Sequence, residues 1–244
     1  MKVEMLNVGR MTASAAIWRQ GEDSEDRLTL PVPAYLLETE SERILVDTGL
    51  HPGACADPIA HYGRPEAMGL FSFEQDEPIS AQVDPATITM IVLTHLHYDH
   101  AGGLSLLPAS IPVVVQRREW EAGHDDEAIA RNFFFPRDYI DDEREVILVD
   151  GDHDLLGDGS IELLSTPGHT PGHQSLRIGG DLVLGADVAY FATGLDDRRF
   201  PAFGDDLAAQ GRSADRLRDL RDAGAAVVPG HDPDALRPGP VSAA

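Results

Sequence analysis

Positive charge is scarce in this chain of 244 residues, which has 19 Lys and Arg against 42 Asp and Glu and a formal net charge of -23. Such a surface repels phosphate backbones and anionic headgroups, so we expect no nucleic-acid partner and no membrane partner. Lysine is almost absent, because Lys2 is the only one. Schiff-base chemistry and a phosphate-loop lysine therefore have no suitable residue.

Cysteine is equally rare, because Cys55 stands alone. This excludes an internal disulfide and a thiolate zinc cluster, and it fits a reducing cytoplasm as the compartment. Long apolar runs are also missing. Glu4 and Arg10 interrupt the segment in which a signal peptide would be apolar, and no run approaches the roughly 20 residues of a membrane helix. We expect a soluble, untargeted protein.

The chain does contain short apolar runs rich in β-branched residues, which are typical of buried strands. These runs cover residues 43–46, 89–93, 112–115, 145–149, 161–164, 181–184 and 225–228. Several end in turns with Gly, Asp or His, so polar side chains gather at strand ends. Helices are predicted over 213–223, with Ser213 as N-cap and Gly224 at the end, and over 116–123 and 125–132.

Strands interleaved with helices in two stretches suggest an α/β sandwich. The hydrophobic content of 42% allows a sizeable core at this length. We find no repeat or linker, so residues 1–244 are expected to form a single domain of two αβ halves. Residues 237–244 are expected to be a loose tail.

The densest pattern is Thr94-His95-Leu96-His97-Tyr98-Asp99-His100, which places three imidazoles and a carboxylate directly after a predicted strand. These ligand types suit zinc or another first-row divalent ion. Asp99 and His100 are expected to point away from the His95 and His97 pair, so one tetrahedral ion does not easily take all four. Two adjacent ions, roughly 3.5 to 4 Å apart in hydrolytic sites, are the natural solution.

Two ions need further ligands, and the candidates are His169, Asp187 and His231. His169 lies in PGHTPGH, where Gly and Pro fix a turn, and the two oxygens of Asp187 could bridge both ions. We expect His173 to support the site rather than to bind metal. The remaining histidines are expected to be surface or hydrogen-bonding residues: His51, His61, His124 and His153.

HLHYDH, PGHTPGH, the Gly-Ala-Asp turn at 185–187 and the final Pro-Gly-His at 229–231 together resemble the metallo-β-lactamase superfamily over nearly the whole chain. The resemblance implies a four-layer αββα sandwich with the metal site at the edge between its two sheets. It also implies two divalent ions, with Zn²⁺ favoured and Co, Mn or Fe as alternatives. The implied ligands are His95, His97 and His169 for one metal, Asp99, His100 and His231 for the other, and Asp187 bridging both.

Tyr190, three residues after Asp187, makes the chain most similar to the N-acyl-homoserine lactonases, which open a neutral lactone ring and so quench quorum signals. HLHYDHAGG, PGHTPGHQSL, VDTG and GLFSF continue that pattern. Two metals would lower the pKa of a bridging water toward 7. Tyr190 would donate a hydrogen bond to the oxyanion, and Asp99 would pass a proton to the leaving alkoxide. The alternative for Tyr190 is an aromatic packed at a strand end.

Apolar residues in predicted loops are candidates for an acyl pocket, although such residues more often belong to a core. We select Tyr98, Phe71 and Phe73 as the pocket lining. The three phenylalanines at 133–135 suit either a pocket or a dimer contact. Monomer and homodimer therefore both stay open.

Other enzymes of the fold share the metal cluster. A glyoxalase II-type hydroxyacylglutathione hydrolase is the closest alternative, but its anionic substrate needs basic contacts, in which this chain is poor. Phosphotriesterases, other esterases and β-lactam hydrolases are further alternatives. The charge opposes a nuclease, and His97 stands where diiron reductases of the fold have a carboxylate. The presence of Asp99 beside a full ligand set argues against a non-catalytic module.

Overall fold

Runs of Val, Ile and Leu form the central strands of two β-sheets in the computed structural model, which describes residues 1–22 and 26–242. The first sheet has the order β13-β1-β2-β3-β5-β6-β7, with β4 paired to β1. Its strands are β1 (Lys2–Ser14), β2 (Arg27–Glu38), β3 (Arg43–Val46), β4 (Ser72–Glu74), β5 (Met90–Val92), β6 (Val113–Gln116), β7 (Val146–Val149) and β13 (Gly239–Pro240). The second has the order β12-β11-β10-β9-β8. Its strands are β8 (His153–Asp154), β9 (Ile161–Ser165), β10 (Gln174–Ile178), β11 (Leu182–Ala186) and β12 (Ala226–Pro229).

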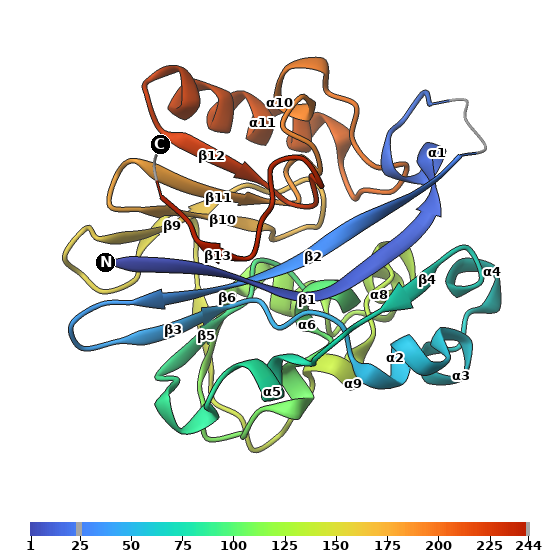
Figure 1. The fold of residues 1–244 in the computed structure, drawn as a ribbon, viewed down its shortest axis with the longest axis horizontal. Helices are drawn as coiled ribbons and strands as arrows, with labels where there is room; N and C mark the ends of the chain where they lie inside the picture. Colours follow the sequence, from blue (N-terminus) through green and yellow to red (C-terminus); the bar gives the residue numbers. More distant parts are fainter. Residues whose placement is uncertain (23–25, 243–244) are drawn as a thin grey trace.

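Helices cover the outer faces of both sheets, which confirms the expected αββα layers (Figure 1). The two helices outside the second sheet are α10 (Gly194–Asp197) and α11 (Leu207–Asp222). The others are α1 (Ala15–Trp18), α2 (Pro52–Ala56), α3 (Pro58–Tyr62), α4 (Pro65–Met68), α5 (Ile79–Gln82), η1 (Pro85–Thr87), α6 (Tyr98–Ala101), η2 (Leu104–Leu106), α7 (Arg117–Ala122), α8 (Asp126–Asn132) and α9 (Pro136–Tyr139). Among the described helices, none has the length and apolar character needed to cross a membrane.

Three apolar clusters bind these layers together. One cluster packs the first sheet against its helices and includes Trp18 and Phe134. A second fills the space between the sheets, and a third packs β11 against α11 through Val183 and Leu217. The layers are also joined by buried amides, because Gln116 on β6 donates a 3.0 Å hydrogen bond to Gln174 on β10.

Parallel pairing brings the important strand ends to one edge of the sandwich. Strands β3, β5, β6 and β7 are parallel neighbours, so their carboxyl ends lie at the same edge of the first sheet. Strands β11 and β12 are parallel in the second sheet, so the residues after them also emerge together. Polar residues that are far apart in the sequence therefore meet where the carboxyl ends of the strands converge.

The structure differs from the sequence-based expectations in several elements. The two long strands β1 and β2 had not been predicted. Helix α11 begins at Leu207 rather than at Ser213, because Asp206 accepts hydrogen bonds from the N–H groups of Ala208 and Ala209 as its N-cap. The C-terminal segment is not loose up to residue 242, since β13 pairs with β1 and Val241 donates a hydrogen bond to Val3. The last part of the expected tail, residues 243–244, lies outside the described residues.

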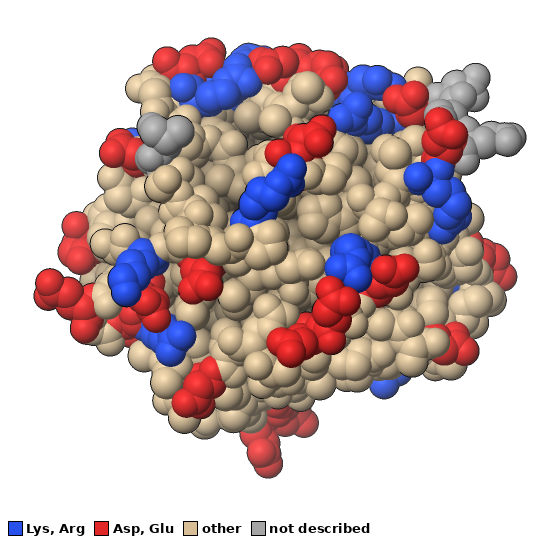
Figure 2. Space-filling model, viewed as in Figure 1, with Lys and Arg blue, Asp and Glu red and all other residues tan. Residues whose placement is uncertain are grey.

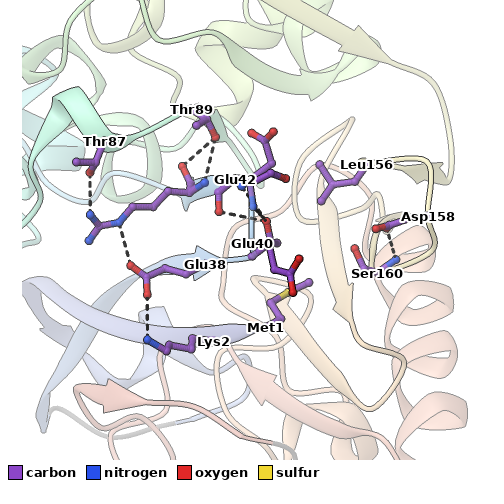
Figure 3. A pocket seen from close by; sticks show the side chains of 13 residues that line it. Met1, Lys2, Glu38, Glu40, Glu42, Thr87, Thr89, Leu156, Asp158 and Ser160 are labelled. Atoms are coloured by element: carbon purple, nitrogen blue, oxygen red, sulfur yellow. Dashed lines mark hydrogen bonds and ion pairs between the residues drawn. The ribbon is translucent and has the colours of Figure 1, made fainter.

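On one face of the molecule, charges of both signs are mixed rather than separated into patches (Figure 2). On the face shown in Figure 2, basic side chains lie among acidic ones. A broad hollow of about 970 Å³ opens near the amino ends of β3 and β5 (Figure 3). Both basic residues of its described lining lie near Glu38: Lys2 at 3.8 Å and Arg43 at 3.1 Å, and Arg43 also donates to Thr87. This hollow lies at the opposite end of the strands from the histidine-rich loop.

Candidate metal centre and adjoining cavity

The loop after β5 buries all four polar side chains of its cluster. His97 is the N-cap of α6, so Asp99 and His100 fall in the first turn of that helix. His95, His97, Asp99 and His100 are each at most 4% exposed. Burying so many ionisable groups is costly unless each has a partner. This loop therefore needs partners from elsewhere in the chain.

The first group of ligand-type atoms combines this loop with the PGHTPGH segment and the end of β11. His97 Nδ1 lies 3.0 Å from both His95 Nε2 and His169 Nε2. The Oδ2 atom of Asp187 lies 3.6 Å from His95 Nε2 and 3.2 Å from His169 Nε2. Three imidazoles and one carboxylate oxygen thus face a common point.

The second group uses the other oxygen of Asp187. Asp187 Oδ1 lies 3.4 Å from His100 Nε2 and 3.1 Å from His231 Nε2. The Oδ2 atom of Asp99 completes the group, at 3.5 Å from His100 Nε2 and 3.4 Å from His231 Nε2. A single carboxylate therefore serves both groups, as the sequence suggested.

Both groups fit divalent metal ions. Tetrahedral zinc with bonds of about 2.0 to 2.1 Å separates its ligand atoms by about 3.3 to 3.4 Å, and the distances above scatter around that value. The atoms Asp99 Oδ2, His100 Nε2, His231 Nε2 and both carboxylate oxygens of Asp187 are buried without a hydrogen-bond partner. Buried polar atoms rarely remain unpaired. Their convergence is what a pair of cation sites requires.

In His97, His100 and His231, the ring nitrogen that faces away from the group is held by another residue. His100 Nδ1 lies 2.8 Å from Asp47 Oδ2, and the same carboxylate accepts from the N–H and hydroxyl of Thr94. His231 Nδ1 donates to the carbonyl of Pro31, and His97 Nε2 donates to that of Asn132, each over 2.8 Å. A donor role for one nitrogen leaves the other as a free lone pair for a metal.

Sequence reasoning had given no role to three of these partners. Asp47 belongs to VDTG and has no role of its own in the sequence pattern, although a carboxylate directly after a buried strand is a usable signal. Its φ of +59° turns the chain so that the carboxylate reaches Thr94 and His100. The carbonyls of Pro31 and Asn132 carry no signal in the sequence, because any residue has a carbonyl.

Charge is distributed unequally between the two groups. Burial lowers the pKa of His97 to about 3, and neighbouring His169 adds to that effect. Burial also acts to lower the pKa of His100, but the carboxylates of Asp187, Asp99 and Asp47 hold it well above its ordinary value. The first group is thus rich in neutral imidazole, whereas the second concentrates carboxylates that favour positive charge.

Tyr190 lies against both groups. Its ring is buried, with its centroid 4.6 Å from that of His231 and 5.8 Å from that of His169. Burial raises the pKa of the Tyr190 hydroxyl well above its ordinary value, and the nearby carboxylates of Asp187 and Asp99 raise it further. The hydroxyl therefore stays protonated and can act as a hydrogen-bond donor at neutral pH.

An apolar cavity of about 180 Å³ leads to Tyr190, His97 and Asp99. Tyr98 and Phe71 line it, as the sequence suggested, and Phe133 lines it as well. Its remaining lining is apolar: Ile17, Ala67, Met68, Leu70, Ala202 and Phe203. Among the described residues around it, none is Lys or Arg.

Two aromatic assignments from the sequence need correction. Phe73 does not line the cavity: it is buried in β4 and packs behind Phe71, with ring centroids 6.0 Å apart. Phe134 and Phe135 are buried within the chain, which removes most of the suggested dimer contact at 133–135. Phe203, in contrast, was missed, because it lies in an irregular segment before α11 without a pattern around it.

The other histidines belong to neither group. His173 accepts a 3.1 Å hydrogen bond from the Asp187 N–H, so it supports the site as expected. His51 and His61 stack on each other with ring centroids 4.4 Å apart. His124 hydrogen-bonds the carbonyl of Trp120, and His153 is exposed in β8.

Comparison with known proteins gives the family of the chain. A model of the metallo-beta-lactamase superfamily matches residues 27–231. The chain belongs to this superfamily. Its relatives include the N-acyl homoserine lactonase AttM of Azorhizobium caulinodans, which is 30% identical over 96% of this chain and 94% of that protein. The N-acyl homoserine lactonase AiiA of Bacillus thuringiensis subsp. kurstaki is 33% identical over 79% of this chain and 77% of its own length.

A solved superfamily structure has the same fold over nearly the whole chain. It is an N-acyl homoserine lactone hydrolase with the product N-hexanoyl-L-homoserine bound at its catalytic metal centre. The superposition gives a TM-score of 0.82 at 28% identity and covers 96% of this chain and 94% of the other. The four-layer architecture is therefore common to both superfamily members.

Proposed function

We propose that this metallo-β-lactamase-fold protein is a dinuclear metal-dependent hydrolase that opens the lactone ring of N-acyl-homoserine lactones. The observation that carries the proposal is the placement of the Tyr190 hydroxyl and Asp99 beside two metal-ligand groups, at the end of an apolar cavity. The relatives AttM and AiiA are named as lactonases of this kind. A neutral ester with an apolar tail suits a cavity lined by Phe71 and Phe133 and free of Lys and Arg among its described residues.

The ligands we assign are His95, His97 and His169 for one ion, Asp99, His100 and His231 for the other, and Asp187 for both. Zinc is favoured because its preferred distances match both groups. When bound, two such ions would supply Lewis acidity that polarises the ester carbonyl and lowers the pKa of a water. Each ligand set is completed only when the loops of both halves of the chain are in place.

The residues of the chain would perform the remaining steps. Tyr190 would donate its hydroxyl proton in a hydrogen bond to the carbonyl oxygen as negative charge develops there. Asp99, which lines the cavity, would take the proton that water releases as its oxygen bonds to the carbonyl carbon, and would deliver that proton to the ring oxygen as the ring C–O bond breaks. Tyr98, Phe71 and Phe203 would hold the acyl chain and exclude water.

The substrate class is tested by comparing esters, thioesters and amides on the metal-loaded protein. N-acyl-homoserine lactones of several chain lengths, a hydroxyacylglutathione, a phosphotriester and a β-lactam would be compared by kcat/KM. We expect the best lactone to exceed the others by at least about 100-fold, because an apolar cavity gives an anionic glutathione group no paired contacts. Rapid thioester cleavage without lactone opening would reject the proposal in favour of a glyoxalase II-type enzyme.

Tyr190→Phe is expected to keep both metals and to lose about 10- to 100-fold in kcat, because one hydrogen bond to the oxyanion disappears. Metal content and kcat would be measured on the same preparation. Tyr139→Phe is the matched control, since the buried Tyr139 hydroxyl donates to Gly123 away from the ligand groups. Equal kcat values for Tyr190→Phe and the unmodified protein would remove Tyr190 from the mechanism.

A further inference from the structure

Glu119 joins the two loops that carry the first ligand group. It is the third residue of α7, and it is 0% exposed. Its Oε1 accepts a 3.0 Å hydrogen bond from the N–H of Leu96, and its Oε2 accepts a 2.7 Å hydrogen bond from the N–H of Gly172. Leu96 stands between His95 and His97, and Gly172 follows His169 by three residues. One carboxylate thus connects the histidines of both halves of the chain.

The contact between Glu119 and the second loop is too close for a side chain at position 172. A Cβ atom built on Gly172 would lie 2.2 Å from the backbone nitrogen of Glu119. Only glycine allows the PGHTPGH segment to approach α7 so closely. Glycine at position 172 is therefore required for the hydrogen bond between its N–H and the Glu119 carboxylate.

The carboxylate of Glu119 is fully buried, where an ionised group is destabilised by the loss of water. Burial raises its pKa to about 7, while the N–H groups of Leu96 and Gly172 act in the opposite direction. A neutral apolar side chain at position 119 would avoid this cost but would leave two buried N–H donors unpaired. The two hydrogen bonds fix the loops rather than merely filling space between them.

The second ligand group is held by different residues. His100 is oriented by Asp47, and His231 by the carbonyl of Pro31. Neither of these hydrogen bonds involves Glu119. Loss of Glu119 should therefore weaken metal binding by the first group more than by the second. A residue that only supports the fold would affect both groups equally.

We propose that Glu119 is a positioning residue that sets the separation between His169 and the His95 and His97 pair, and thereby the affinity of the three-histidine group for its metal. His169 Nε2 lies 3.0 Å from His97 Nδ1, so a shift of either loop would change this ligand set directly. The inference deepens the proposed function and rests on its metal assignment. It does not depend on which ester is hydrolysed.

The test is metal binding by Glu119→Gln in the full chain. Zn²⁺ affinity at both sites would be measured by competition with a chromophoric chelator, starting from metal-free protein. Glutamine keeps one acceptor oxygen but turns an NH₂ group toward the other backbone N–H, so one donor loses its partner. We expect one of two Zn²⁺ equivalents to bind about 10- to 100-fold more weakly, with the other unchanged. Glu121→Gln, an exposed position on the same helix, should leave both unchanged.

Glu119→Asp provides a milder variant if Glu119→Gln folds poorly. It keeps the carboxylate but shortens the side chain by one methylene, and it should weaken the same single equivalent to a smaller extent. Unchanged affinity at both sites in either folded variant would overturn the proposal. Equal weakening at both sites would also overturn it, because a general loss of structure acts on both groups. If Glu119→Gln weakens only one Zn²⁺ equivalent but the protein opens no lactone, the positioning role of Glu119 is supported and the lactonase assignment is rejected.

Discussion

Asp187→Asn is expected to empty both proposed metal sites and to lower kcat by at least about 1000-fold, since metal ions provide several kcal/mol of transition-state stabilisation. The reason is the shared use of one carboxylate. Oδ2 of Asp187 lies 3.2 Å from His169 Nε2, and Oδ1 lies 3.1 Å from His231 Nε2. Asparagine has only one acceptor oxygen, and its NH₂ group would direct hydrogens at the nitrogen lone pairs of one group. No rotation of the side chain serves both groups.

The measurement combines metal content by mass spectrometry with chelator competition and lactone turnover. Asp206→Asn is a suitable control, because Asp206 only caps α11 and asparagine is an equally good N-cap. The control should retain two metals and normal turnover. Two tightly bound metals in Asp187→Asn would contradict the bridging role, whatever the effect on turnover. The metal readout thus separates ligand assignment from substrate assignment.

Arg144→Met is expected to lower the free energy of unfolding by about 3 to 5 kcal/mol, which is typical of breaking a buried charged network. The Arg144 side chain is 2% exposed, and its guanidinium donates hydrogen bonds to four backbone carbonyls, 2.8 to 3.3 Å away. These carbonyls belong to Leu104, Leu107, Pro108 and Ile111. The segment that they form connects the metal loop to β6. Methionine would leave all four carbonyls without this donor.

For a chain of this size the change corresponds to a Tm about 10 °C lower, since 1 kcal/mol is worth roughly 2 to 4 °C. Thermal unfolding of the metal-free protein would measure it. Arg117→Met is the matched control: Arg117 is exposed and pairs with Asp150, so its loss should cost less than about 1 kcal/mol. Equal Tm values for the two variants would show that the buried hydrogen bonds of Arg144 contribute little.

The long strands β1 and β2 illustrate what the sequence pattern conceals. Pro31 and Pro33 lie within β2, although proline cannot donate to the hydrogen-bond ladder of a sheet. Among the described strands, only β1 pairs with β2 at these two positions, because β3 pairs with residues 35–38. The pairing of β1 and β2 shifts register between Asn7 and Arg10, opposite these prolines. At this irregularity the Asn7 and Val8 carbonyls accept from Gln82 and Gln75 instead. Contacts with distant segments thus stabilise a strand that local rules disfavour.

The start of α11 shows a second limit of local patterns. Ser213 has the chemistry of an N-cap, but its hydroxyl donates to the carbonyl of Pro167 in the loop of His169. Gly211 lies inside the helix, where glycine is usually unfavourable. The helix extends through these residues from its N-cap Asp206, and the side chains of Gln210 and Ser213 bond to the loops that carry Asp187 and His169. Gln210 donates to the carbonyl of Asp187.

From the sequence, the αββα class could be predicted through the resemblance of its motifs to a known superfamily. The same motifs at strand ends named the seven ligand-type residues that the structure brings together, because each motif is local in the chain. Only the tertiary structure decided which atoms share a site. His95 and His169 come from different halves, and they meet through parallel strand ends, the Asp187 carboxylate and the Glu119 link. The cavity beside Tyr190 likewise draws on α1, α4 and the segment before α11. Such contacts depend on chain geometry and on backbone carbonyls and N–H groups, which are the same in every residue except proline, so no sequence pattern records them.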